Sequence, residues 1–259
     1  MSAVVARPAA RPVRRSPLAR TIRHQLTAQL YVGAWFWAII LFGVVVATLI
    51  VSRFGAVETS IMQYARQGTL WFPFSMMIFL LSAGLTPHVA AGMTRRSFAA
   101  AATAVSLIVA AANALVLVGL LQVERAVYSA AGWTQSLTDG GLDLVSSTSD
   151  IGPLLAALVV TGAAATASGL VVGVVYYRAG GWWGTLTLPL TVGPILVVGQ
   201  LLSGTIGPFG VPVLGEDTWA TSTPSGLALR TAVSAALIAL LLAVFHRLTR
   251  TTPLGKPVV

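Results

Sequence analysis

The stretch Gly92-Met93-Thr94-Arg95-Arg96-Ser97-Phe98 is a short, doubly basic connection between two long apolar segments. Between Arg66 and Glu124 the sequence contains no other Asp, Glu, Lys or Arg. Because a guanidinium group is costly to place among lipid tails, both arginines are expected in water, at lipid headgroups or against a partner. The stretch therefore separates two membrane spans and marks one end of the bundle they belong to.

The composition is that of a polytopic membrane protein. Of 259 residues only 9% are charged and 56% are hydrophobic, whereas a soluble domain carries about 25% charged residues. The absence of cysteine excludes disulfides, thiol nucleophiles and thiolate metal sites. The net charge of +9 comes from basic residues that flank apolar segments, which favours membrane orientation and lipid contact over nucleic-acid binding.

Six apolar stretches are long enough to cross a bilayer, which takes about 20 helical residues at about 1.5 Å each. They lie near residues 31–52, 69–91, 98–123, 151–177, 182–203 and 227–246. This pattern predicts an all-α fold, a single bundle of six transmembrane helices formed by residues 16–250. Residues 1–15, rich in arginine and proline, predict a disordered basic tail, and residues 251–259 a second tail.

A separate amphipathic helix is predicted before the first span. Ser16-Pro17 is typical of a helix start. The apolar residues that follow recur every fourth position, which places them on one face: Leu18, Ile22, Leu26 and Leu30. This stripe predicts a helix lying in the membrane plane; the alternative is a plain extension of the first span.

Two interruptions are predicted near the last two spans. The fifth stretch contains Pro189, Gly193 and Pro194, which predicts a kink or break. Residues 204–226, between the fifth and sixth helices, are rich in glycine and proline. With their apolar residues they predict a broken segment that lies on the outer surface or, alternatively, dips into the bundle.

The distribution of charge predicts the orientation. With the N-terminus inside, most arginines fall on the inner side and every acidic residue falls outside. The basic bias is the one that sets orientation. We therefore expect a plasma-membrane protein whose N- and C-termini are both cytoplasmic.

No catalytic chemistry is evident. The sequence lacks a Gly-x-x-x-x-Gly-Lys-Ser/Thr phosphate loop and a His-Glu-x-x-His pair, and its three histidines are scattered. We therefore expect no enzyme, cofactor or metal site. No acidic residue lies in the middle of a span, which argues against a proton- or sodium-driven carrier. A transporter of this kind would need an external motor.

Two runs resemble a known family. Residues 85–98, ending in Gly92-x-Thr94-Arg95-Arg96-x-Phe98, are similar to the cytoplasmic turn after the second span of actinobacterial ABC-transporter permease subunits of the ABC-2 type. Residues 175–181 (Val-Tyr-Tyr-Arg-Ala-Gly-Gly) resemble the same group after the fourth span. The resemblance implies a partner ATPase on the cytoplasmic face, a second permease subunit and a coupling role for the turn Gly92–Phe98.

Each residue type in the turn suits that role. Gly92 permits unusual backbone angles, and Thr94 can cap the following helix. Arg95 and Arg96 can pair with acidic groups of a partner, and Phe98 can wedge into an apolar groove. Met93 and Ser97 complete the predicted coupling element. The alternative is that both arginines only satisfy the positive-inside preference and extend to headgroups.

Three further residues predict helix packing. Gly169 and Gly173 form a Gly-x-x-x-Gly pair that lets another helix approach closely. The contact would lie within one subunit or, alternatively, in a dimer. Asn113 lies within the third span and is expected to form an interhelical hydrogen bond, with substrate contact as the alternative.

The span layout, the basic turn and the resemblance together predict a permease subunit of an ATP-driven ABC transporter. That it exports its substrate, which stays unspecified, is implied by the resemblance alone. The alternative is a non-transporting membrane scaffold or immunity-type protein that acts by binding. An intramembrane enzyme is the weakest of the three hypotheses.

Overall fold

The structure is a computed structural model that describes residues 16–137, 148–203 and 224–252. The predicted N-terminal tail and residues 253–259 of the C-terminal tail therefore lie outside the described residues. So do residues 138–147 and most of the segment 204–226. Within the described ranges the fold is all-α, as predicted. Its α-helices are α1 (Pro17–Phe54), α2 (Ala65–Ala90), α3 (Arg95–Ala131), α4 (Ile151–Leu186), α5 (Leu188–Ser203) and α6 (Pro224–Thr251), with a 3₁₀ turn, η1 (Met62–Tyr64).

Five of the described helices are long and apolar enough to cross a membrane: α1, α2 with η1, α3, α4 and α6. The protein is therefore a multi-pass membrane protein. Five of the six predicted spans are therefore shown, and the fifth stays a prediction, because the described part of α5 has 16 residues and so a length of about 24 Å. The hydrocarbon core is about 30 Å thick.

The predicted in-plane helix is not a separate element. α1 is a single helix of 38 residues from Pro17 to Phe54, which matches the alternative of a plain extension. Its N-cap forms as expected, because Ser16 Oγ accepts a hydrogen bond from Ala19 N at 3.3 Å. No proline follows Pro17 inside α1 to interrupt the backbone hydrogen bonds.

No break interrupts α5 at Gly193 and Pro194; the chain instead turns twice before α5 begins. α4 is interrupted at Gly180, whose φ is 77° and ψ 179°, and the chain turns again at Thr187 before α5 begins. α5 then continues through Gly193 and Pro194. Pro189 is harmless at its position, because the N–H that it lacks would be unpaired in the first turn of any helix.

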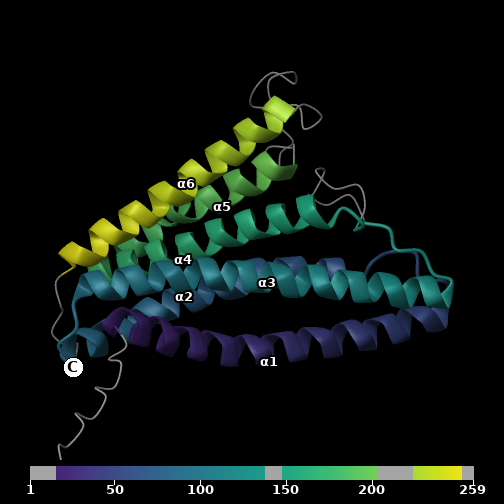
Figure 1. Cartoon of the computed structure of the whole chain (residues 1–259), viewed down its shortest axis with the longest axis horizontal. Helices are drawn as coiled ribbons and strands as arrows, with labels where there is room; N and C mark the ends of the chain where they lie inside the picture. The colour runs from purple at the N-terminus through teal and green to yellow at the C-terminus, as the bar shows by residue number, and fades with distance from the viewer. Residues whose placement is uncertain (1–15, 138–147, 204–223, 253–259) are drawn as a thin grey trace, which may run out of the picture.

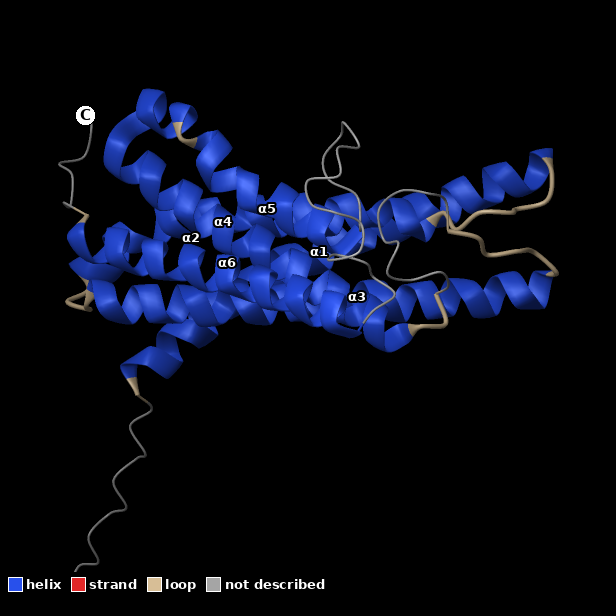
Figure 2. Ribbon diagram, turned by 90° about the horizontal axis from the view of Figure 1, so that it is seen from above, coloured by secondary structure: helices blue, strands red, loops and turns tan. Residues whose placement is uncertain are grey.

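α4 is the central helix of the bundle. It contacts α2 and α3 on one side and α5 and α6 on the other, whereas α1 packs mainly on α3. Figure 2 shows the described helices running roughly along one long direction, with no strand. This arrangement buries α4 most deeply among the helices long enough to span.

The bundle has two distinct ends (Figure 1). The tail end carries the start of α1, the connection between α2 and α3, the Gly180 break and the end of α6. The loop end carries residues 55–64, 132–137 and 148–150. The start of α1 and the end of α6 share one end of the bundle, because α5 returns the chain toward the loop end.

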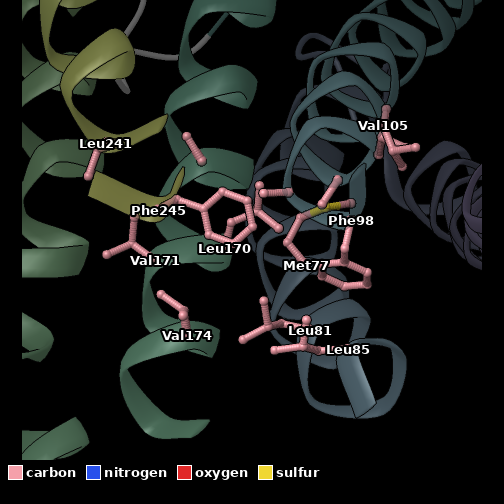
Figure 3. Close-up of a cluster of buried hydrophobic side chains, with 14 residues drawn as sticks. Met77, Leu81, Leu85, Phe98, Val105, Leu170, Val171, Val174, Leu241 and Phe245 are labelled. Carbon is pink, nitrogen blue, oxygen red and sulfur yellow. The ribbon is translucent and has the colours of Figure 1, made fainter. Parts of the chain in front are cut away.

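The largest core cluster lies toward the tail end, where α2, α3, α4 and α6 meet (Figure 3). It includes Met77, Leu81 and Leu85 of α2, Phe98 of α3 and Phe245 of α6. In lipid the helices are held by close packing, because the lipid tails are as apolar as the side chains. This cluster therefore joins the basic connection to the centre of the bundle.

Candidate functional site

The connection between α2 and α3 is a closed, sharply defined turn. α2 ends with Gly92 in the left-handed region, at φ 79°. Gly92 N donates to Val89 O at 2.9 Å, and Met93 N donates to His88 O at 3.3 Å. This pair of hydrogen bonds is the Schellman arrangement, which satisfies the last carbonyls of a helix and requires a residue that tolerates positive φ. Gly92 occupies that position.

Thr94 caps the next helix, as its sequence position predicts. Thr94 is extended, and its Oγ1 accepts a hydrogen bond from Ser97 N at 3.1 Å. In return Ser97 Oγ donates to Thr94 O at 2.7 Å. The turn therefore passes from the end of α2 to the start of α3 with its backbone groups satisfied.

His88 ties the end of α2 to the start of α3. Its Nε2 lies 3.1 Å from Ser97 Oγ. Because the single hydroxyl hydrogen of Ser97 is donated to Thr94 O, His88 Nε2 must donate in this contact. This side-chain hydrogen bond links the two helices across the turn and makes it stiff.

Phe98 anchors the turn in the chain's own core (Figure 3). Its side chain is 1% exposed and belongs to the cluster with Leu81 and Leu85. The His88 ring meets it edge-on, with ring centroids 5.3 Å apart. A Cβ at Gly84 would lie 3.2 Å from Phe98 Cε2. The groove that receives Phe98 is therefore formed by the same chain, and Phe98 is not part of the surface that a partner could touch.

The exposed part of the turn is basic. Thr94 and Arg96 are exposed, and Met93, Arg95 and Ser97 are half-buried. The acidic residues that the structure describes lie at the loop end: Glu58, Glu124 and Asp150. A partner that neutralises Arg95 and Arg96 therefore has to supply its own carboxylates.

The second family-like run braces the same end of the bundle. Arg178 Nη1 donates to Thr251 Oγ1 at 2.6 Å, which joins α4 to the last turn of α6. The hydroxyl of Tyr177 lies 2.9 Å from Thr86 Oγ1 of α2. Gly180, within the run 175–181, interrupts α4 at this end of the bundle. Side chains thus connect the end of α4 to both α2 and α6.

The structure places Gly169 and Gly173 against α2 of the same chain. A Cβ at Gly169 would overlap Phe74 O, and a Cβ at Gly173 would lie 3.2 Å from Ile78 Cα. The small residues therefore allow the backbones of α2 and α4 to approach closely, as in other membrane bundles.

Asn113 joins α3 to α1. Its Oδ1 accepts a hydrogen bond from Trp37 Nε1 at 3.0 Å, and its Nδ2 donates to Val109 O at 2.9 Å. Both polar ends of the amide are satisfied within the bundle, which leaves a structural rather than a substrate-binding role for this residue.

Sequence reasoning missed a buried carboxylate at the loop end. Glu124 is 7% exposed. Its oxygens accept from Ile61 N at 3.0 Å, Met62 N at 2.9 Å and Gln135 Nε2 at 2.8 Å, and also from Ser60 Oγ. Glu124 thus holds the α1–α2 and α3–α4 connections to α3. The available signal was its position as the first charged residue after a long apolar stretch.

Sequence reasoning also missed the burial of Arg230, which lies near the outer end of the sixth apolar stretch. It is 4% exposed inside the bundle, and its Nη1 donates to Leu201 O at 3.2 Å in the last turn of α5. A cation at the C-terminal end of a helix is favourable for its dipole. The signal was that Arg230 is the only charged residue in the sixth apolar stretch.

Comparison with protein-family models, with curated proteins and with solved structures finds no match to this chain. Among the residues that the structure describes, no cluster of His, Cys, Asp or Glu could hold a metal ion. The basic turn at the tail end is therefore the feature on which a function can be argued.

Proposed function

We propose that this protein is a permease subunit of an ATP-driven ABC exporter in the plasma membrane, with the tail end facing the cytoplasm. In this proposal a separate ATPase docks on the turn Gly92–Ser97, and a second permease subunit completes the pathway. The observation that carries the proposal is a stiff, doubly basic turn displayed at one end of the bundle and anchored in its core.

The turn is suited to transmit force because hydrogen bonds and core packing hold both of its ends in place. His88 links α2 to α3 through Ser97, and Phe98 fixes the start of α3 in the core. α2 in turn packs directly on α4 at Gly169 and Gly173. Displacement of the turn would therefore move α2 and α3 together against α4, as coupling through rigid, contiguous elements requires.

The need for an external motor supports the same proposal. The sequence has no phosphate loop. Its one described carboxylate inside a helix of spanning length, Glu124, lies at the loop end and is occupied by hydrogen bonds. A membrane chain of this kind is suited to be driven by a partner that hydrolyses ATP.

The test is co-purification with a phosphate-loop ATPase encoded beside this gene. We expect Arg95→Ala plus Arg96→Ala to weaken association about tenfold or more, because docking would leave carboxylates of the partner unpaired. The matched control is Arg247→Ala plus Arg250→Ala, which removes two exposed arginines of α6 at the same end. ATP-dependent transport should fall with the first pair and not with the second.

Unchanged association and transport in the Arg95/Arg96 variant would overturn the coupling role. An equal loss in both double variants would indicate general attraction to a basic surface rather than docking on the turn. A protein that binds a partner without any ATP-dependent flux would instead fit the scaffold or immunity-type alternative.

A further inference from the structure

The sixth helix carries a buried cation that neither the coupling role nor the helix packing uses. Arg230 lies in the second turn of α6 and is 4% exposed. It is the only Asp, Glu, Lys or Arg of α6 before Arg247. A charged side chain inside a membrane span is costly, faces the interior of the bundle and commonly marks an ion or substrate pathway. A counter-charge is therefore expected beside Arg230.

The described protein supplies only part of what this cation needs. Arg230 Nη1 donates to Leu201 O of α5 at 3.2 Å, which is a neutral oxygen. Arg230 Nε is buried and has no hydrogen-bond partner. Because an unpaired polar group is costly to bury, and a charged one more so, this side chain has both a donor and a charge that remain to be satisfied.

A second unpaired donor lies one turn further along the same face. Ser234 is 0% exposed, and its Oγ also has no hydrogen-bond partner. A hydroxyl inside a helix ordinarily donates to the carbonyl four residues before it, as Thr249 Oγ1 does to Phe245 O at 2.8 Å. Residues four apart have Cβ atoms about 5–6 Å from each other. One small ligand can therefore meet both Arg230 and Ser234.

Both donors lie on the inward face of α6. One turn beyond Ser234, Ile238 packs against the core cluster that contains Val198 and Leu202 of α5. The surroundings of the two donors are therefore protein rather than bulk water, and a low local dielectric strengthens the attraction between a cation and an anion.

The carboxylates that the structure describes do not neutralise Arg230. They belong to Glu58, Glu124 and Asp150. Glu58 and Asp150 are exposed, and the oxygens of Glu124 accept hydrogen bonds from η1 and its flanking residues. Within the described ranges, the positive charge of Arg230 is thus left to a ligand.

We propose that Arg230 and Ser234 bind a small monovalent anion of the halide class, held on the inward face of α6 beside α5. The guanidinium supplies the charge, and Nε–H and Oγ–H each donate a hydrogen bond to the ion. A single charge matches the one buried cation, and a small ion suits two donors that lie one helical turn apart. This inference does not depend on the ATPase proposal.

The experiment uses the full chain in nanodiscs of zwitterionic lipid, with chloride as the probe, gluconate as the replacement anion and the line width of chlorine NMR as the readout. We expect saturable broadening that bromide displaces. Affinity should fall about tenfold or more in Arg230→Gln, because the charge is lost, and about two- to tenfold in Ser234→Ala, because a neutral donor is lost. Arg125→Gln is the matched control, since Arg125 is an exposed arginine near the loop end.

Thermal unfolding gives a second readout that does not require every variant to fold. A ligand that binds the folded state raises its unfolding midpoint, so the wild type should unfold at a higher temperature in chloride than in gluconate. Ser234→Thr, which keeps the hydroxyl, should retain this difference, and Arg230→Gln should lose it. The wild-type comparison alone remains decisive if a variant is unstable.

A further variant tests whether carboxylates outside the described residues neutralise Arg230 instead. Chloride binding should be unchanged in Glu216→Gln plus Asp217→Asn. The proposal is overturned if the wild type shows neither saturable broadening nor a higher midpoint in chloride. It is also overturned if chloride binds only when Glu216 and Asp217 are replaced, or if Arg230→Gln and Arg125→Gln change binding equally.

Discussion

Glu124 is a single carboxylate that organises a whole end of the molecule. It accepts hydrogen bonds from two consecutive backbone amides, Ile61 N and Met62 N, and from Gln135 Nε2. Gln135 in turn accepts from Thr148 Oγ1 at 2.7 Å, just before α4. Because a buried charge is tolerated only when its hydrogen bonds are satisfied, this network fixes where η1 and the α3–α4 connection lie.

Replacing that carboxylate gives a prediction at the scale of one residue. Glu124→Gln keeps the shape but removes the charge and turns one acceptor into a donor that faces N–H groups. We expect a loss of about 1.5–3 kcal/mol per charge-assisted hydrogen bond that is broken. Glu58→Gln is the control, because Glu58 is exposed and such substitutions usually change stability by less than about 0.5 kcal/mol.

The measurement is the free energy of unfolding of both variants in the same detergent, by denaturant titration monitored through tryptophan fluorescence. Equal stability of the two variants would contradict the role of Glu124. The free energy of unfolding of Glu124→Gln should be lower, while cross-linking at the tail end should show that the α2–α4 contacts are intact. That combination would localise the effect to the loop end.

At the scale of elements, the pairing of α2 with α4 depends on two small residues. The backbone of α2 occupies the space that a side chain at Gly169 would need, because a Cβ there would overlap Phe74 O. Gly119 in α3 offers a contrast, since a Cβ there would have no atom within 4 Å. Gly169 and Gly119 therefore both lie inside long helices, but only Gly169 is packed against another helix.

We expect Gly169→Ala to destabilise the bundle by about 1–3 kcal/mol, as overpacking usually does. Gly119→Ala should be neutral or stabilising by up to about 1 kcal/mol, because alanine is the better helix former. The measurement is the thermal unfolding midpoint of the two variants in detergent, with size-exclusion chromatography as the readout of the folded fraction. Equal midpoints for the two variants would mean that the helices can separate to accommodate the methyl group.

How far the sequence predicts these elements depends on the physical signal. Long apolar runs located α1, α2, α3, α4 and α6, and the Gly92 and Thr94 positions correctly predicted a helix end and a helix start. The stripe Leu18–Leu30 misled, because periodicity alone does not say whether a helix continues without a break into the next span. Proline was equally ambiguous, since its effect depends on its position in the helix.

The candidate sites were harder to predict because they depend on contacts between distant segments. Phe98 looked available to a partner, yet its pocket is supplied by α2 of the same chain. Glu124 and its backbone donors Ile61 and Met62 are about sixty residues apart in sequence, and they meet only because the bundle packs α3 beside η1. Burial of that kind follows from tertiary structure and leaves little local pattern.

At the scale of the whole molecule, the α2–α3 turn, the start of α1 and the end of α6 all lie at one end of the bundle. That end therefore faces either the cytoplasm or the outside as a unit. The chain has no cysteine, so one introduced thiol reports one position. We predict that Arg125→Cys, exposed in α3 toward the loop end, reacts with a membrane-impermeant maleimide added to intact cells. Arg96→Cys, exposed at the turn, should react only after the cells are opened.

The physical reason for this expected outcome is the concentration of arginines at the tail end, because a basic bias of this kind favours the cytoplasmic side. Arg247→Cys, exposed in the last two turns of α6, should behave like Arg96→Cys because both lie at the same end of the bundle. If Arg96→Cys and Arg247→Cys were labelled from outside while Arg125→Cys was protected, the orientation would be the opposite of the predicted one. It would also place the basic turn beyond the reach of a cytoplasmic ATPase.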